Sequence, residues 1–244
     1  MTRVYRSQGR FKQTLKSSSF NAWTKFYKQD ENANNAIVSY YTKGFALFLD
    51  LKIRLETDGE KSLDDVMRTL WNEHGAKDIG TEVNTHQQII ESLLNRDCYD
   101  LFAYLENTQD IPLAPLMEKV GISMRLRASA GNMDLGGGDT KGYEIAFGAK
   151  IKPESIGLKV LTVAQESPAH QAGLSAGDLL ISANHLQVDA QFEKQLQTMN
   201  LGDEVLLHWF RRDELMQGIM PIHATIKDTI SLDIQDQEKL KIWL

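Results

Sequence analysis

Apolar residues in the first half of the chain recur every three or four positions, which is the spacing of one face of an α-helix. The pattern predicts five or six packed helices. Ser62 and Asp65 have the spacing of a capping box, and Gly75 supplies a C-terminal stop for the same helix. The helical segments are 19–28, 36–54, 62–75, 82–95, 98–107 and 111–121. The first half is therefore expected to be all-helical.

After Gly121 the pattern changes to alternating apolar and polar residues interrupted by glycine and proline, which is typical of short strands joined by turns. Residues 157–164 and 204–212 have the pattern of strands, and residues 189–200 that of a short amphipathic helix. The sequence thus predicts a multidomain α + β protein without internal repeats. Its expected parts are a helical domain (1–121), a linker or first strand (122–141), a small β-rich domain (142–228) and a C-terminal tail (229–244).

One long apolar helix carries two adjacent tyrosines, Tyr40 and Tyr41. Tyr41 shares the apolar stripe of Phe45 and Phe48, whereas Tyr40 lies roughly 100° away around the helix. A glycine inside a helix costs about 1 kcal/mol relative to alanine, so Gly44 favours close approach by another element or a ligand. Tyr41 is therefore either a core tyrosine bonded to a carbonyl or a phenol that points into a cleft.

The charge pattern narrows the range of partners. The net charge of -6 is spread along the chain without a basic block, so neither nucleic acid nor an anionic membrane is expected. No uncharged apolar run reaches about 18 residues, and the first 20 residues contain no apolar signal-peptide core. The expected location is accordingly the cytoplasm.

Metal-binding and nucleophilic residue types are present but form no recognised motif. The six histidines are scattered without H-E-x-x-H spacing, and the single cysteine, Cys98, is expected to fill the core. Glu73 and His74 are expected in the solvent-exposed last turn of a helix, where a partly charged imidazole interacts favourably with the helix dipole. The glycine-rich stretch 134–142 does not match the sequence motif of a phosphate-binding loop. The serine-hydrolase motif G-x-S-x-G is also not present. The sequence therefore predicts no metal and no cofactor in this chain.

The β-rich half resembles a PDZ domain of the bacterial type. The resemblance is carried by the pattern S-P-A-x-x-A-G-L-x-x-G-D at Ser167, Pro168, Ala169, Ala172, Gly173, Leu174, Gly177 and Asp178. It implies a carboxylate-binding loop at Ala146, Phe147, Gly148 and Ala149, with Phe192 and Leu196 lining the groove. Peptides or protein C-termini are then the expected partners, added as a strand to an open sheet edge. Where many members of the family have a glycine, this loop has Ala146.

The two halves together resemble the C-terminal part of the glycyl aminopeptidase family of zinc metallopeptidases, which is similar to thermolysin-like and alanyl aminopeptidase-type enzymes. The resemblance rests on residues 17–44, 62–71 and 110–122, followed by the PDZ-like segment. In related enzymes a Tyr-x-Lys-Gly motif supplies a tyrosine that stabilises the oxyanion, and Tyr41 to Gly44 matches it. The resemblance places zinc, H-E-x-x-H and a distal glutamate in a catalytic segment that this chain lacks. The chain alone is thus expected to be inactive.

Two alternatives remain open at the level of sequence. The chain is either part of such a peptidase or a stand-alone interaction module, in which the helices are a scaffold and the PDZ domain selects protein C-termini. Independently of that choice, the PDZ domain either binds peptides or only packs against its neighbour.

Overall fold

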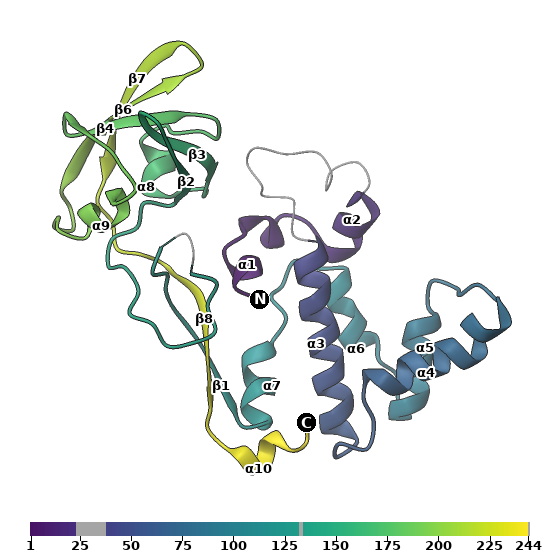
Figure 1. The fold of residues 1–244 in the computed structure, drawn as a ribbon. Coiled ribbons are helices and arrows are strands. Elements are labelled where there is room, and N and C mark those ends of the chain that lie inside the picture. The colour runs from purple at the N-terminus through teal and green to yellow at the C-terminus, as the bar shows by residue number, and fades with distance from the viewer. Residues whose placement is uncertain (23–37, 132–133, 244) are drawn as a thin grey trace.

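The computed structural model of the chain describes the backbone of residues 1–22, 38–131 and 134–243, with the side chains of Gln8 and of residues 38–41 outside that description. Helices, including short 3-10 turns labelled η, form its first half (Figure 1). They are α1 (Thr2–Tyr5), η1 (Gln8–Phe11), α2 (Leu15–Phe20), α3 (Val38–Glu56), α4 (Leu63–Glu73), η3 (Gly75–Lys77), α5 (Thr85–Leu94), α6 (Tyr99–Phe102), η4 (Ala103–Leu105) and α7 (Leu113–Lys119).

The core of the helical half forms around α3, the long helix at the centre of that half in Figure 1. Phe45 and Phe48 stack on one another with ring centroids 6.0 Å apart. Phe102 meets the first ring edge-on at 5.9 Å, and Tyr104 meets the second at 5.3 Å. Cys98 is completely buried in the same cluster. The described part of the apolar stripe, Phe45 and Phe48, therefore faces inward, as its spacing predicted.

The start and end of α4 follow from its capping residues. The Ser62 hydroxyl accepts a hydrogen bond from the N–H of Asp64 at 3.2 Å, while the Asp65 carboxylate accepts one from the N–H of Ser62 at 2.9 Å. This reciprocal arrangement satisfies N–H groups that the first turn of a helix leaves unpaired. The helix ends at Glu73, two residues before Gly75. The capping box and the stop predicted from sequence are confirmed.

The second half is built on an antiparallel six-stranded sheet with strand order β2-β3-β4-β6-β7, to which β5 adds beside β4. The strands and the short helices that cover the sheet are β2 (Ala149–Glu154), β3 (Gly157–Val163), α8 (Pro168–Gln171), β4 (Leu179–Ala183), β5 (Leu186–Gln187), α9 (Phe192–Leu196), β6 (Glu204–Arg211) and β7 (Glu214–Pro221). Because β2 pairs with β3 on one side alone among the described strands, its second edge is open.

A separate two-stranded ribbon joins the halves. It pairs β1 (Ile122–Ala128) with β8 (Lys227–Ile234), and it is followed by α10 (Gln237–Leu240). Ile122 is part of the helical core, and Trp243 packs against it. Arg6 of the N-terminal region donates hydrogen bonds to Ser129 at 2.8 Å and to Thr229 at 2.5 Å. The ribbon is thereby fixed to the helical half (Figure 1).

The prediction of an all-helical first half therefore holds in part. Helices and antiparallel strands are both present, but the ribbon completes the helical core with residues from segments predicted as a linker or first strand (122–141) and as a tail (229–244). Within the described residues no helix combines the length and the apolar character that crossing a membrane requires.

Candidate functional site

The loop before β2 contains two successive backbone N–H groups without a hydrogen-bond acceptor among the described residues. The carbonyl of Phe147 accepts a hydrogen bond from Ala169 at 3.0 Å, and that of Gly148 accepts one from Ala164 at 2.8 Å. The N–H groups of Phe147 and Gly148, in contrast, have no acceptor among the hydrogen bonds of the described residues. Consecutive unpaired N–H groups are the donors with which a backbone turn binds a carboxylate.

Glycine is required at position 148. Its φ is +78°, in the left-handed region that other residues rarely adopt. A Cβ built there would lie 2.1 Å from the Cβ of Ser167. Ser167 is itself fixed as the N-cap of α8, where its hydroxyl accepts a hydrogen bond from the N–H of His170. The loop can therefore follow this path only because residue 148 has no side chain.

The predicted groove residues on α9 lie in the core. Phe192 and Leu196 are each 1 % exposed, and the Phe192 ring meets that of Phe147 edge-on at 5.1 Å. Ala149 is also buried in this cluster, whereas Ala146 is partly exposed. Four of the six residues predicted for the peptide site therefore lie in one buried cluster: Phe147, Ala149, Phe192 and Leu196. Phe192 and Leu196 offer a ligand almost no exposed surface.

Gln197, which sequence reasoning missed, connects α9 to the loop. Its side-chain oxygen accepts hydrogen bonds from the N–H groups of Glu144 at 2.8 Å and Ile145 at 3.0 Å. Its side-chain nitrogen donates to the carbonyl of Ile145 at 2.9 Å. A glutamine just after an amphipathic helix is ordinary in sequence, so no pattern along the chain pointed to it.

Asp178, the acidic residue of the PDZ-like pattern, has a structural role. Asp178 is completely buried, and its two oxygens accept hydrogen bonds from Arg211 of β6, both at 2.9 Å. It also accepts one from the N–H of Ser175 at 2.8 Å. The carboxylate in turn raises the pKa of Arg211. Asp178 therefore fixes the turn before β4 to the sheet and is not available to a ligand.

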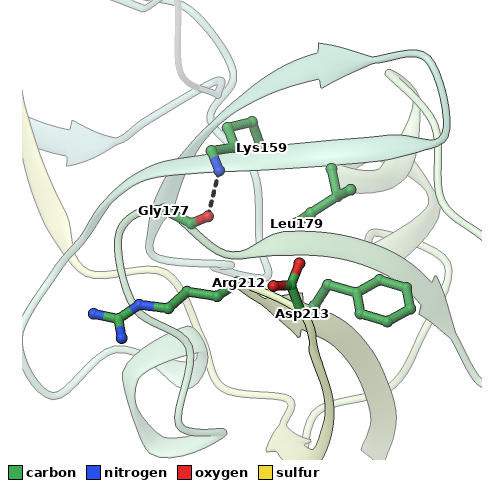
Figure 2. Close-up of a pocket in the computed structure, with 6 residues that line it drawn as sticks. Lys159, Gly177, Leu179, Arg212 and Asp213 are labelled. Atoms are coloured by element: carbon green, nitrogen blue, oxygen red, sulfur yellow. Dashed lines mark hydrogen bonds between the residues drawn. The ribbon is translucent and has the colours of Figure 1, made fainter.

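A shallow pocket of about 510 Å³ lies elsewhere on the same half (Figure 2). Its lining residues are Lys159, Gly177, Leu179, Phe210, Arg212 and Asp213. The Lys159 ammonium donates to the carbonyl of Gly177, and Arg212 extends away from Asp213 (Figure 2). None of the residues predicted for the peptide site lines this pocket.

In the helical half, Tyr41 belongs to the first turn of α3, but its side chain lies outside the described residues. Gly44, one turn further, is buried.

His74, expected at a solvated helix end, caps α4, and its Nδ1 lies 3.0 Å from the carbonyl of Gly80. Burial raises the pKa of the Cys98 thiol, which makes it a poor nucleophile. Over the described ranges, no three metal-binding side chains gather around one point.

Comparisons with known proteins found a family match in each half of the chain. Residues 1–47 match the M61 glycyl aminopeptidase family, and residues 120–219 match the PDZ domain. The crystal structure of an aminopeptidase N family protein from Idiomarina loihiensis is 38% identical, with a TM-score of 0.93 over 100% of this chain. This chain spans 42% of that protein's length. None of the curated proteins compared matches the chain.

Two further solved structures match part of this chain. The serine endoprotease from Yersinia pestis is 20% identical, with a TM-score of 0.31 over 34% of this chain and 30% of its own. The HtrA3 PDZ domain bound to a phage-derived ligand is 16% identical, with a TM-score of 0.30 over 43% of this chain and 91% of its own. The match at residues 1–47, the PDZ domain that follows it and the likeness of the whole chain to an aminopeptidase N family protein are together consistent with part of a protein of the M61 glycyl aminopeptidase family.

Proposed function

We propose that this chain is part of a zinc metallo-aminopeptidase, in which peptide hydrolysis is carried out by the complete protein. The observation that supports this best is the 38% identity to an aminopeptidase N family protein, which extends over the whole chain while covering 42% of that protein. The remaining part of such a protein would supply the catalytic zinc site. Tyr41 would supply the hydroxyl that stabilises the oxyanion of the tetrahedral intermediate.

The described residues of this chain do not fit a zinc site. A catalytic zinc needs three protein ligands of the His, Cys or carboxylate type. No such group of three is found in the described part of the chain. The His185 and His208 rings come within 5.6 Å of each other, but Nδ1 of His208 lies 3.0 Å from the hydroxyl of Ser182 and no third ligand is near. We therefore assign the metal to the complete protein and not to this chain.

The competing function is a stand-alone interaction module. The mass of the native protein in its source cells separates the two. A chain more than twice this size supports the peptidase, and a native mass of 27.6 kDa supports the module.

For the PDZ half we propose binding of peptide or protein C-termini. The observation that favours it is the pair of unpaired N–H groups at Phe147 and Gly148 beside the open edge of β2. A peptide carboxylate would accept from these N–H groups, and the peptide backbone would pair with β2. Lys150 and Lys152 are exposed on that strand and would favour an anionic terminus.

Calorimetry on the full chain tests this prediction with pentapeptides that end in valine, leucine or phenylalanine. We expect micromolar binding of at least one free acid, and binding at least about tenfold weaker for its C-terminal amide, because the amide removes a charged acceptor. Equal binding of the acid and amide forms, or no binding, would leave the PDZ domain as a packing module.

A further inference from the structure

The side chain of Gln197 makes the maximum number of hydrogen bonds open to a glutamine. Its oxygen accepts from the N–H groups of Glu144 and Ile145 at 2.8 and 3.0 Å. Its nitrogen donates to the carbonyls of Ile145 and Glu193 at 2.9 and 3.0 Å. Backbone N–H groups can only donate and carbonyls can only accept, so the amide has one possible orientation. No neutral side chain of another type reproduces this set of bonds at one position.

These bonds join the two sides of the expected peptide groove. Gln197 directly follows α9, and Glu144 and Ile145 directly precede the loop whose N–H groups at 147 and 148 are unpaired. Another contact between α9 and the loop is the aromatic pair Phe147 and Phe192, which is less directional than a hydrogen bond. The N–H of Ala146 donates to the carbonyl of His223 at a longer 3.3 Å.

We propose that Gln197 is a positioning residue for ligand recognition: it sets the direction of the Phe147 and Gly148 N–H groups relative to α9, and so determines how strongly a free carboxylate is preferred. This inference rests on the proposed binding of C-termini. It assigns Gln197 no direct contact with the ligand. Its effect is therefore expected on the ratio of acid to amide affinity and not on contacts with the rest of the peptide.

The test compares Gln197→Ala with Gln195→Ala in the full chain. Gln195 lies on the same helix but is exposed, so it controls for loss of a glutamine from α9. Calorimetry uses a pentapeptide ending in valine, leucine or phenylalanine, as free acid and as amide. We expect Gln197→Ala to bind the acid at least about tenfold more weakly with amide affinity unchanged, because misdirected N–H groups lose a charged hydrogen bond. Gln195→Ala should match the wild type.

A second variant, Gln197→Glu, allows the preference for the free acid to be compared at two pH values in the same folded protein. At pH 8 its second carboxylate oxygen would face the carbonyls of Ile145 and Glu193, which repel it. At pH 5 a protonated carboxyl can donate to one of them, while the peptide carboxylate, with a pKa of about 3.5, stays ionised. The preference for the acid should therefore be low at pH 8 and partly recover at pH 5. The wild type, which shares the ionisable Glu144 and Glu193, is measured at both pH values.

The outcomes are distinguishable. If the wild type prefers the acid and both Gln197 variants keep the same preference at pH 8, the positioning role is wrong and the proposed function stands. If acid and amide affinities fall together, Gln197 supports the fold alone and the inference is again overturned. If the wild type itself shows no preference, the proposed binding of C-termini fails, and this inference with it. If Gln197→Ala does not fold, Gln197→Glu at the two pH values decides.

Discussion

At the scale of single residues, Gly148 controls the shape of the loop before β2. Gly148→Ala would place a Cβ 2.1 Å from that of Ser167 and would force a φ of +78° on an alanine. We expect the free energy of unfolding to fall by about 2 kcal/mol or more, because strain and overpacking add. Binding of free-acid peptides should be lost.

Gly202→Ala is the matched control for this prediction. Gly202 has a comparable φ of +92°, but a Cβ there meets nothing within 4 Å. This variant should lose only about 1 kcal/mol, from the backbone conformation alone. Thermal and urea unfolding of the two variants measure the difference, and equal losses would show that contact with Ser167 is unimportant.

Tyr41 is the residue on which the proposed chemistry depends. In the complete enzyme, Tyr41→Phe keeps the ring but removes one donor to the oxyanion, which should lower kcat by about 10²- to 10³-fold with little change in KM. A core tyrosine would instead lose about 1 kcal/mol of stability with normal turnover. Steady-state kinetics and melting temperature distinguish these results. Tyr40→Phe, on another face of the helix, is the control.

At the scale of elements, an ion-pair cluster ties the end of α3 to the segment between α5 and α6. Glu56 accepts two hydrogen bonds from Arg96, at 2.8 and 2.9 Å, and pairs with Lys52 at 2.8 Å. The hydrogen bonds from Arg96, helped by Lys52, lower the pKa of Glu56 to about 2. The pair contributes stability because the ionised carboxylate is favoured in the folded state.

The lowered pKa of Glu56 sets how the stability contributed by this cluster changes with pH. With a folded pKa below the unfolded value, the contribution is complete above about pH 4.5 and is lost as the pH falls toward 2. Glu56→Gln should lower the free energy of unfolding by about 1–2 kcal/mol at pH 7, after allowance for solvent screening, and by much less at pH 2.5. Chemical denaturation at both pH values measures this.

Glu106→Gln is the control for that prediction, since the Lys16–Glu106 pair is more than half exposed on both sides. A surface pair of this kind contributes about 0–1 kcal/mol. If Glu56→Gln had an effect no larger than Glu106→Gln at pH 7, the cluster would be shown not to hold the two elements together.

At the scale of the whole molecule, the lack of three metal-binding side chains around one point among the described residues predicts how the purified chain behaves. We expect it to bind no stoichiometric zinc and to hydrolyse no aminoacyl substrate, because three suitable ligands do not come together in its described parts. Elemental analysis and an aminopeptidase assay check both points. One tightly bound zinc per chain, with activity that a chelator abolishes, would contradict the assignment of catalysis to the complete protein.

The sequence by itself determined the elements whose signals are local. Helical spacing placed α3 and α4, the Ser62 capping box marked where α4 begins, and the PDZ-like pattern around Gly173 and Asp178 identified the second half. These features depend on residues a few positions apart, so their physical causes can be read along the chain. The family followed from motifs of the same local kind.

The tertiary structure alone decided what depends on residues far apart in sequence. Arg6 donates a hydrogen bond to Thr229 across 223 positions. The segments predicted as a linker or first strand and as a tail pair into a ribbon that completes the helical core. Gln197 bonds Glu144 across 53 positions. Whether Phe192 lines a groove or fills a core likewise depends on Phe147, which packs against it. Hydrogen bonding and burial are set by partners in space, and a pattern along the chain does not contain them.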